Sequence, residues 1–317
     1  MTIKKRILAP LSVVALGALM LAGCSSNGSA SPSTSSKEGT TVVTGGADGK
    51  TGFTISADSE LSERAKNLVK GGELDIATSA SSPPYGFYDG EVLRGSDIDL
   101  GYAISAKLGL KAKYSAMDFS GIIPAIATGR YDFSIASMGD TPAREKSVDF
   151  VDYSTDSNSI VTVKGNPKGI SGIESLCRLK VSSVEGSVLL GLLQEQNKKC
   201  SNPIDITIFK DNATALLQVQ NGRADATMYQ TGIALYLIKT DAASKNLEVV
   251  SNTEYGKGYN AIAFSKKNAE LRDLVKDALT SLKEDGIYKA IEDSWGLGAN
   301  MVDEFTVNDG LKYNQPS

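Results

Sequence analysis

From residue 73 onward, short apolar runs alternate with amphipathic stretches, and this alternation constrains the fold more than any other feature of the sequence. Each apolar run has the length of a strand, and each amphipathic stretch places its apolar side chains on one helical face. The expected strands lie at residues 73–78, 111–115 and 133–136, and the expected helices lie at residues 96–108, with Ser96 as N-cap, and 120–128. Strands that alternate with helices form a largely parallel sheet covered by helices, so the sequence predicts an α/β fold.

One loop pattern occurs twice. Residues 129–132 read GRYD, and residues 222–225 read GRAD. In both places a glycine ends a helix pattern, and an apolar strand pattern begins after the aspartate. The repetition predicts two similar α/β lobes, although two common helix–strand loops can also resemble each other by chance. Asp132 and Asp225 are expected to be turn residues and not ligands.

Two extended segments, at residues 159–163 and 260–264, are able to cross between the lobes. Helix patterns at residues 268–284 and 287–294 then return the chain to the first lobe. Two crossings form a two-segment hinge, and ligands of open α/β sheets bind at the carboxyl ends of the strands, here in the cleft between the lobes. The expected boundaries are residues 57–162 for the first part of lobe 1, 163–257 for lobe 2, 258–300 for the return to lobe 1 and 301–317 for a C-terminal tail.

The residue types present exclude several kinds of chemistry. The 317-residue chain contains no histidine, which excludes Ser-His-Asp and Cys-His catalysis and every histidine-ligated metal site. Three cysteines are too few for a zinc site of four thiolates. The formal net charge of −4 leaves no basic surplus to neutralise a phosphate backbone. We expect no metal, no cofactor and no nucleic-acid partner.

The N-terminus has the pattern of an export signal. Basic residues at positions 4–6 precede an apolar run at residues 7–20, which is too short to span a bilayer. Residues 21–24 read LAGC and resemble the lipobox of bacterial lipoproteins. That resemblance implies a lipoprotein signal peptide at residues 1–23 and a lipid on Cys24, anchored to the extracytoplasmic face of the cell membrane. The alternative is an ordinary signal peptide followed by a chance cysteine.

Residues 24–56 are rich in Ser, Thr and Gly, so this segment is predicted to be a flexible linker between the anchor and the globular body. Beyond the membrane the chain faces an oxidising compartment. Cys177 and Cys200 can form a disulfide there, with two separate buried thiols as the alternative.

Four motifs resemble one protein family. They are residues 95–100 (GSDIDL), 118–125 (DFSGIIPA), 141–144 (TPAR) and 148–150 (VDF). In this order and spacing they resemble the polar amino acid-binding proteins of bacterial ABC importers, and the resemblance runs from about residue 73 to residue 297. It implies a two-lobed periplasmic-binding-protein-like fold with two Rossmann-like lobes. It also implies a monomer that has no catalytic residue, binds a small molecule and delivers it to the permease subunits of an ABC importer.

The resemblance assigns roles to several residues. Arg144 resembles the family's carboxylate-binding arginine, and a guanidinium offers two parallel charge-assisted hydrogen bonds to a carboxylate. The helix that starts beside Arg144 would add backbone N–H groups. Ser137 and the Gly139 amide match carboxylate-holding positions at a strand end. Phe119 matches an aromatic wall of the ligand site, with a core position as the alternative.

The second lobe would close on the ligand from the other side. Ser187 and the Val188 amide fall in the glycine-containing loop that makes this contact in the family.

Three positions depart from the family pattern. Ser79 and Gln230 stand where relatives usually have acidic residues, of which the second pairs with the ligand's α-ammonium. Ser82 stands where a stacking aromatic is common, so Tyr85 or Tyr88 is expected to replace it. Either Asp140 or Glu185 has taken over the ammonium, or the ligand lacks a strong cation, because an unpaired buried ammonium is costly.

The loss of negative charge makes a lysine- or arginine-type ligand the least expected class. We expect a neutral or acidic amino acid, or an N-modified relative. Two alternatives stay open: a lyase acting on small carboxylates, with Glu185 as its acid–base candidate, and a sensory receptor that presents its closed form to a membrane partner.

Overall fold

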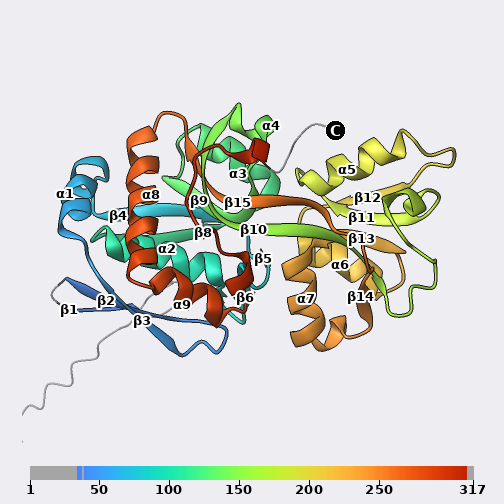
Figure 1. Cartoon of the computed structure of the whole chain (residues 1–317), viewed down its shortest axis with the longest axis horizontal. Helices are drawn as coiled ribbons and strands as arrows, with labels where there is room; N and C mark the ends of the chain where they lie inside the picture. The colour runs from blue at the N-terminus through green and yellow to red at the C-terminus, as the bar shows by residue number, and fades with distance from the viewer. Residues whose placement is uncertain (1–33, 38, 313–317) are drawn as a thin grey trace, which may run out of the picture.

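The computed structural model describes residues 34–37 and 39–312, which fold around one nine-stranded sheet (Figure 1). The strands lie in the order β12 (Asp205–Phe209), β11 (Lys180–Val184), β13 (Ala226–Gln230), β10 (Val148–Val163), β15 (Tyr255–Ser265), β9 (Phe133–Gly139), β4 (Glu73–Thr78) and β8 (Lys111–Ala116), and β14 (Leu247–Val249) pairs with β10. The sheet is shared by two lobes, because β10 and β15 run through both (Figure 1). The predicted two-lobed α/β fold is confirmed.

Helices cover the sheet in each lobe (Figure 1). The first lobe contains α1 (Ser59–Leu68), α2 (Ser96–Lys107), α3 (Phe119–Ala127), α4 (Pro142–Glu145), α8 (Ala269–Glu284) and α9 (Ile287–Ser294), with a small sheet of β5 (Ser81–Ser82), β6 (Gly86–Asp89) and β7 (Val92–Arg94). The second lobe contains α5 (Val188–Asn197), α6 (Asn212–Gln220) and α7 (Thr231–Thr240). Short 3₁₀ turns are η1 (Ile173–Leu176), η2 (Ala242–Ser244), η3 (Gly298–Asn300) and η4 (Gly310–Lys312).

The sheet is parallel around β4 and around β11, and it is antiparallel wherever the crossing strands β10 and β15 take part. β4 pairs in parallel with β8 and β9, and β11 pairs in parallel with β12 and β13. β10 pairs antiparallel with both β13 and β15, and β15 pairs antiparallel with β9. The crossing segment that was expected at residues 159–163 is therefore the end of a strand that begins at Val148.

The duplicated loop has the same structural role in both lobes. The Asp132 N–H donates to the Asp75 carbonyl (2.9 Å), and the Asp132 carboxylate accepts from the Asp75 N–H (2.8 Å). Asp225 makes the same two bonds with Lys180 (2.7 and 2.9 Å). Asp75 and Lys180 lie on the central parallel strands β4 and β11. Both aspartates are thus turn residues that align neighbouring strands, as expected.

The start of α2 differs by one residue from the sequence prediction. Gly95, not Ser96, is the N-cap, and it has a φ of +140°. A Cβ at Gly95 would lie 1.8 Å from the Tyr85 carbonyl oxygen. Glycine is required because the backbone of the β5–β6 connection approaches this position so closely.

The flexible linker predicted at residues 24–56 is wrong for its C-terminal half. This half forms an antiparallel sheet of β1 (Thr34–Lys37), β2 (Thr40–Gly45) and β3 (Thr51–Ser56) that packs on α2 and α9. Val43, Phe53 and Ile55 are buried, because their spacing places them on the face of the sheet toward the lobe. The composition concealed this short alternating pattern. The predicted signal peptide, Cys24 and residues 24–33 lie outside the described residues.

The C-terminal segment packs along β10. Met301 forms a bridge with Ser154, Val307 forms one with Val151, and Phe305 is buried. Residues 301–312, expected as a tail, are thus part of the first lobe's surface.

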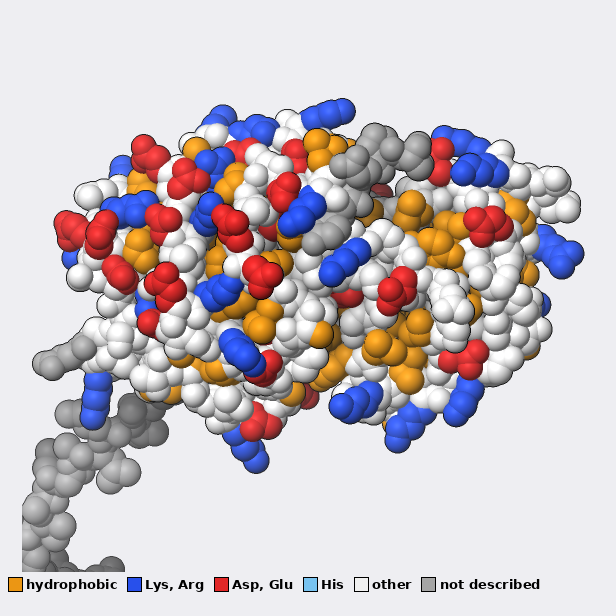
Figure 2. Space-filling view, in the orientation of Figure 1, with side chains coloured by type: hydrophobic (Ala, Val, Ile, Leu, Met, Phe, Trp, Pro, Cys, Tyr) orange, Lys and Arg blue, Asp and Glu red, His pale blue; other side chains and the backbone are white. Residues whose placement is uncertain are grey.

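Apolar side chains reach the surface mainly on the second lobe, and Figure 2 shows them gathered there, while charges of both signs are interspersed over the first lobe. The exposed large apolar residues of the second lobe are Val188, Leu192, Ile208, Leu217 and Leu235. Within residues 34–37 and 39–312, no helix is long and apolar enough to cross a membrane. The same residues contain no group of three or more acidic or cysteine side chains arranged to hold a metal ion.

The predicted disulfide is confirmed. Cys177 and Cys200 are bonded, with their Cα atoms 5.5 Å apart. The bond ties the residue after η1 to the turn that follows α5. Cys200 packs against the second lobe's core, which includes Leu176 and Leu193.

Replacing Cys177 and Cys200 together by serine should lower the free energy of unfolding by about 3 kcal/mol, because the bond closes a 23-residue separation and restricts the unfolded chain. Urea unfolding of the oxidised protein and the double variant measures the difference. The reduced wild-type protein is the matched control and should unfold like the variant. Equal stability of all three samples would contradict the prediction.

Candidate ligand-binding cleft

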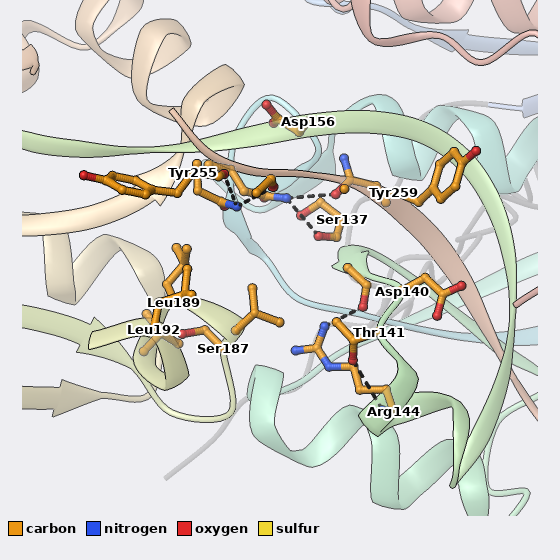
Figure 3. Close-up of a pocket in the computed structure, with 18 of the residues that line it drawn as sticks. Ser137, Asp140, Thr141, Arg144, Asp156, Ser187, Leu189, Leu192, Tyr255 and Tyr259 are labelled. Atoms are coloured by element: carbon orange, nitrogen blue, oxygen red, sulfur yellow. Dashed lines mark hydrogen bonds between the residues drawn. The ribbon is translucent and has the colours of Figure 1, made fainter. Parts of the chain in front are cut away.

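A cavity of about 550 Å³ lies between the lobes, beside the crossing strands (Figure 3). Its lining comes from the ends of β9 and α4 in the first lobe, from the starts of α5 and α7 in the second, and from β10 and β15. The volume falls within the range of small-molecule sites, about 300–1,000 Å³.

Eight of the ten residues expected at the ligand site line this cavity: Ser82, Phe119, Ser137, Gly139, Arg144, Ser187, Val188 and Gln230. Ser79 and Tyr85 do not. The Ser79 hydroxyl lies 3.3 Å from that of Ser81, and Tyr85 is fully buried, with its hydroxyl donating to Asp156 (2.9 Å). Tyr88 lies exposed on β6. Tyr85 contacts the lining residue Asp156 but does not line the cavity itself. The expectation that Tyr85 or Tyr88 replaces the family's stacking aromatic is therefore wrong.

Arg144 is a cation fixed at the meeting point of the lobes. Its guanidinium donates to the carbonyl of Gly139 in the first lobe (2.6 Å) and to that of Gly186 in the second (2.9 Å). Its Cζ atom lies 5.5 Å from the centre of the Phe119 ring, which adds a cation–π contact. Burial lowers the pKa of Arg144 to about 10, so the side chain stays charged at neutral pH. Figure 3 shows the guanidinium facing the space between the lobes.

Arg144 lies on the short helix α4, which begins at the N-cap Thr141. The Thr141 hydroxyl accepts from the Arg144 N–H (3.3 Å), and Thr141 caps α4. Because α4 has only four residues, its dipole adds less to an anion site than the expected helix start would.

Ser137 is held by a buried carboxylate. Ser137 has a φ of +43°, which is unusual for a residue with a side chain, and its N–H donates to Asp97 Oδ2 (2.7 Å). The Tyr153 hydroxyl of β10 donates to Asp97 Oδ1 (2.5 Å). Burial raises the pKa of Asp97 to about 7, although both hydrogen bonds lower it. Asp97 thus connects a wall of the cavity to a crossing strand.

Neither acidic candidate for an ammonium partner points into the cavity. Figure 3 shows the Asp140 carboxyl pointing away from the Arg144 guanidinium. Burial, then the charges of Asp152 and Glu145, raise the pKa of Asp140 well above its usual range. Glu185 is not part of the lining, and its Oε2 lies 3.5 Å from the Ser120 hydroxyl.

Gln230 joins the lobes across the cavity. Its Nε2 donates to Asn260 Oδ1 (2.8 Å) and to the Ser137 carbonyl (3.3 Å). Asn260 Nδ2 in turn donates to the Ser154 hydroxyl (3.2 Å). The Asn212 side chain of the second lobe donates to the Ser82 hydroxyl of the first (2.8 Å). The two lobes are therefore in contact on both sides of the cavity.

The second-lobe wall begins at a glycine turn. Gly186 has a φ of +75°, and a Cβ there would lie 3.3 Å from Ser120 of the first lobe. Ser187 is the N-cap of α5, and its hydroxyl accepts from the Leu190 N–H (3.1 Å). The turn thus brings the Gly186 carbonyl to Arg144 and opens α5 toward the cavity.

Sequence reasoning missed the lining residues of the crossing strands, which are Asp156, Asn158, Tyr255, Gly256, Gly258, Tyr259 and Asn260. A signal was present in residues 154–159 (STDSNS), an uninterrupted polar run between two apolar runs of one strand. Such a run inside a buried strand indicates a polar cavity, because polar groups buried without partners are costly.

Comparison with known proteins agrees with this arrangement. The sequence profile of the bacterial extracellular solute-binding proteins, family 3, matches residues 74–298. The arginine-binding extracellular protein ArtP of Bacillus subtilis is 30% identical over 230 residues, which cover 71% of this chain and 87% of ArtP.

Two solved structures share the fold. An ancestral arginine-binding protein bound to arginine has a TM-score of 0.66 at 36% identity and covers 71% of this chain and 98% of its own. The ancestral amino acid-binding protein AncCDT-1, a precursor of cyclohexadienyl dehydratase, has a TM-score of 0.65 at 31% identity and covers 75% and 99%.

Asp97→Ala should loosen the segment that carries Ser137, because the Ser137 N–H loses its buried acceptor and the positive φ loses its support. Hydrogen exchange should become at least about tenfold faster in peptides covering residues 133–139, which corresponds to 1.4 kcal/mol. Asp99→Ala is the matched control. Asp99 lies on the same helix but bonds Gly46 and Trp295, away from the cavity. Equal effects of the two variants on these peptides would refute the role of Asp97.

Proposed function

This chain belongs to the bacterial extracellular solute-binding proteins of family 3, and we propose that it captures a polar, neutral or acidic amino acid or a related small carboxylate and delivers it to the permease of an ABC importer. The ligand binds in the interlobe cavity, and the lobes close over it. Binding energy from both lobes shifts an equilibrium between open and closed forms, and no covalent step is needed.

The observation that carries this proposal is the position of Arg144. A guanidinium has five N–H groups, and the two hydrogen bonds to Gly139 and Gly186 leave others for a carboxylate. Ser137, Gly139 and Ser187 also line the cavity and are the other residues proposed to contact the ligand's carboxylate. A carboxylate at this place contacts both lobes at once.

The charges of the lining support a neutral or acidic ligand. Gln230 is uncharged, and the two carboxylates of the described lining, Asp140 and Asp156, are engaged with other groups of the protein. The cavity therefore offers little negative charge to a lysine or arginine side chain. ArtP and the ancestral protein bind arginine, which makes arginine the most informative ligand to exclude.

The proposed setting is the extracytoplasmic face of the cell membrane, with a lipid on Cys24 as the anchor and a single chain as the functional unit. The support is the lipobox-like segment at residues 21–24, the family match and the disulfide, which is typical of oxidising compartments.

Catalysis is not part of the proposal. AncCDT-1 is a precursor of a dehydratase, so the fold is compatible with an enzyme. A lyase needs a general acid or base within reach of its substrate, and Glu185 lies outside the cavity lining. Binding alone therefore accounts for the site.

Arg144→Ala should abolish ligand binding, with an affinity loss of at least about 100-fold, because charge-assisted hydrogen bonds contribute about 1.5–3 kcal/mol each. Thermal shifts against a panel of amino acids and small carboxylates measure this, since a ligand at about 100 times its dissociation constant adds about 2.7 kcal/mol of stability. Arg130→Ala removes the same charge from an exposed site on the same lobe and should bind normally. Retained binding by Arg144→Ala would eliminate the carboxylate model.

Cys24→Ala should move the protein from the membrane fraction to the soluble extracytoplasmic fraction, because the lipid attachment site is lost. Cys177→Ser is the control, since it removes a cysteine without touching the anchor. Fractionation and labelling with a fatty-acid analogue report the outcome. Continued labelling of Cys24→Ala would disprove the anchor.

A further inference from the structure

An α-ammonium buried in a cleft needs an ionised carboxylate or several free oxygen acceptors, because burying it unpaired is costly. Two acceptors beside Gln230 in this cavity are the Ser137 carbonyl and Asn260 Oδ1. Both already accept from Gln230 Nε2, at 3.3 and 2.8 Å. An uncharged amide of the protein thus occupies acceptors that an amine would use.

The orientation of Gln230 is fixed by its neighbours. Asn260 Nδ2 donates to the Ser154 hydroxyl, so Asn260 presents its oxygen to Gln230. The Ser137 carbonyl is only an acceptor. Gln230 must therefore donate to both, and turning its amide round would place two oxygens against each other.

The carboxylates of the described lining are Asp140 and Asp156, and both are engaged elsewhere. Asp140 points away from Arg144 and interacts with Asp152 and Glu145. Asp156 accepts from the Tyr85 hydroxyl (2.9 Å) and from the N–H groups of Ser157 (2.8 Å) and Gly232 (3.3 Å). The cavity therefore has a fixed cation, and each of its two lining carboxylates is already engaged by other groups of the protein.

The second-lobe wall opposite Arg144 is largely apolar. Val188, Leu189, Leu192 and Ile233 line it, and Figure 3 shows Leu189 and Leu192 facing the cavity beside Ser187. These four side chains fit an uncharged ligand body.

We infer that the cleft selects small carboxylates that lack a free α-ammonium: N-acylated amino acids, or their deaminated 2-oxo and 2-hydroxy counterparts. The carboxylate binds Arg144, and an uncharged acyl or oxo group needs no anionic partner where an ammonium would find none. This inference rests on the proposed function and narrows its ligand class.

The test compares matched forms of the same side chain on the purified full-length protein. The probes are leucine, methionine, glutamine and glutamate, each as the free amino acid, the N-acetyl form and the 2-oxo acid, with arginine as a further free amino acid. Thermal shift finds the binders and titration calorimetry gives the dissociation constants. The N-acetyl or 2-oxo form should bind at least tenfold more tightly than its free amino acid.

A free amino acid that binds as tightly as its blocked partners, or tighter, overturns this inference but leaves the proposed function standing. Absence of binding by every probe overturns both. These two failures are therefore distinguishable with the wild-type protein alone.

Gln230→Asp tests the position responsible. A carboxylate there should strengthen binding of free amino acids at least tenfold and weaken binding of the N-acetyl forms. Gln194→Asp is the matched control, because it makes the same change at an exposed residue of the second lobe outside the cavity lining and should not change the preference. An unchanged preference in Gln230→Asp, with an unchanged melting temperature, would remove Gln230 from the selection.

Discussion

The antiparallel pairing of β10 with β15 is the constraint on which the rest of the structure depends. Each lobe is a parallel unit around its own central strand, β4 or β11, and only these two long strands run through both units. Strands buried in a sheet need apolar side chains, yet the cleft needs polar ones. The polar run at residues 154–159 helps to meet both needs, because it supplies Asp156 and Asn158 where the strand passes the cavity.

Several polar contacts join the two lobes around the cleft. Arg144 reaches the Gly186 carbonyl, Asn212 reaches Ser82, and Gln230 reaches the Ser137 carbonyl. Each of these is a hydrogen bond that water can replace when the lobes separate, so the net stability of closure without ligand is small. A ligand that adds bonds to both lobes can therefore control the equilibrium.

The alternating strands and helices could be predicted from the sequence, and so could most residues of the candidate site. Arg144, Ser187 and Gln230 were expected at the site from the family resemblance, and all three line the cavity. The hairpin at residues 40–56 was missed because a Ser/Thr/Gly-rich composition concealed an alternating pattern. The direction of the Asp140 carboxyl and the Tyr85–Asp156 bond depend on tertiary packing, which no local pattern encodes.

The position of Gln230 shows how one amide can change what a cleft selects without changing its shape. A carboxylate at this position would repel the Ser137 carbonyl and Asn260 Oδ1 unless a cation lay between them, so closure would require a positive ligand group. The glutamine side chain supplies its own donors and satisfies the same two oxygens. We infer that closure then does not require a cation, while Arg144 still favours an anion. On this inference the cleft discriminates by the charge its ligand lacks as well as by the charge it carries.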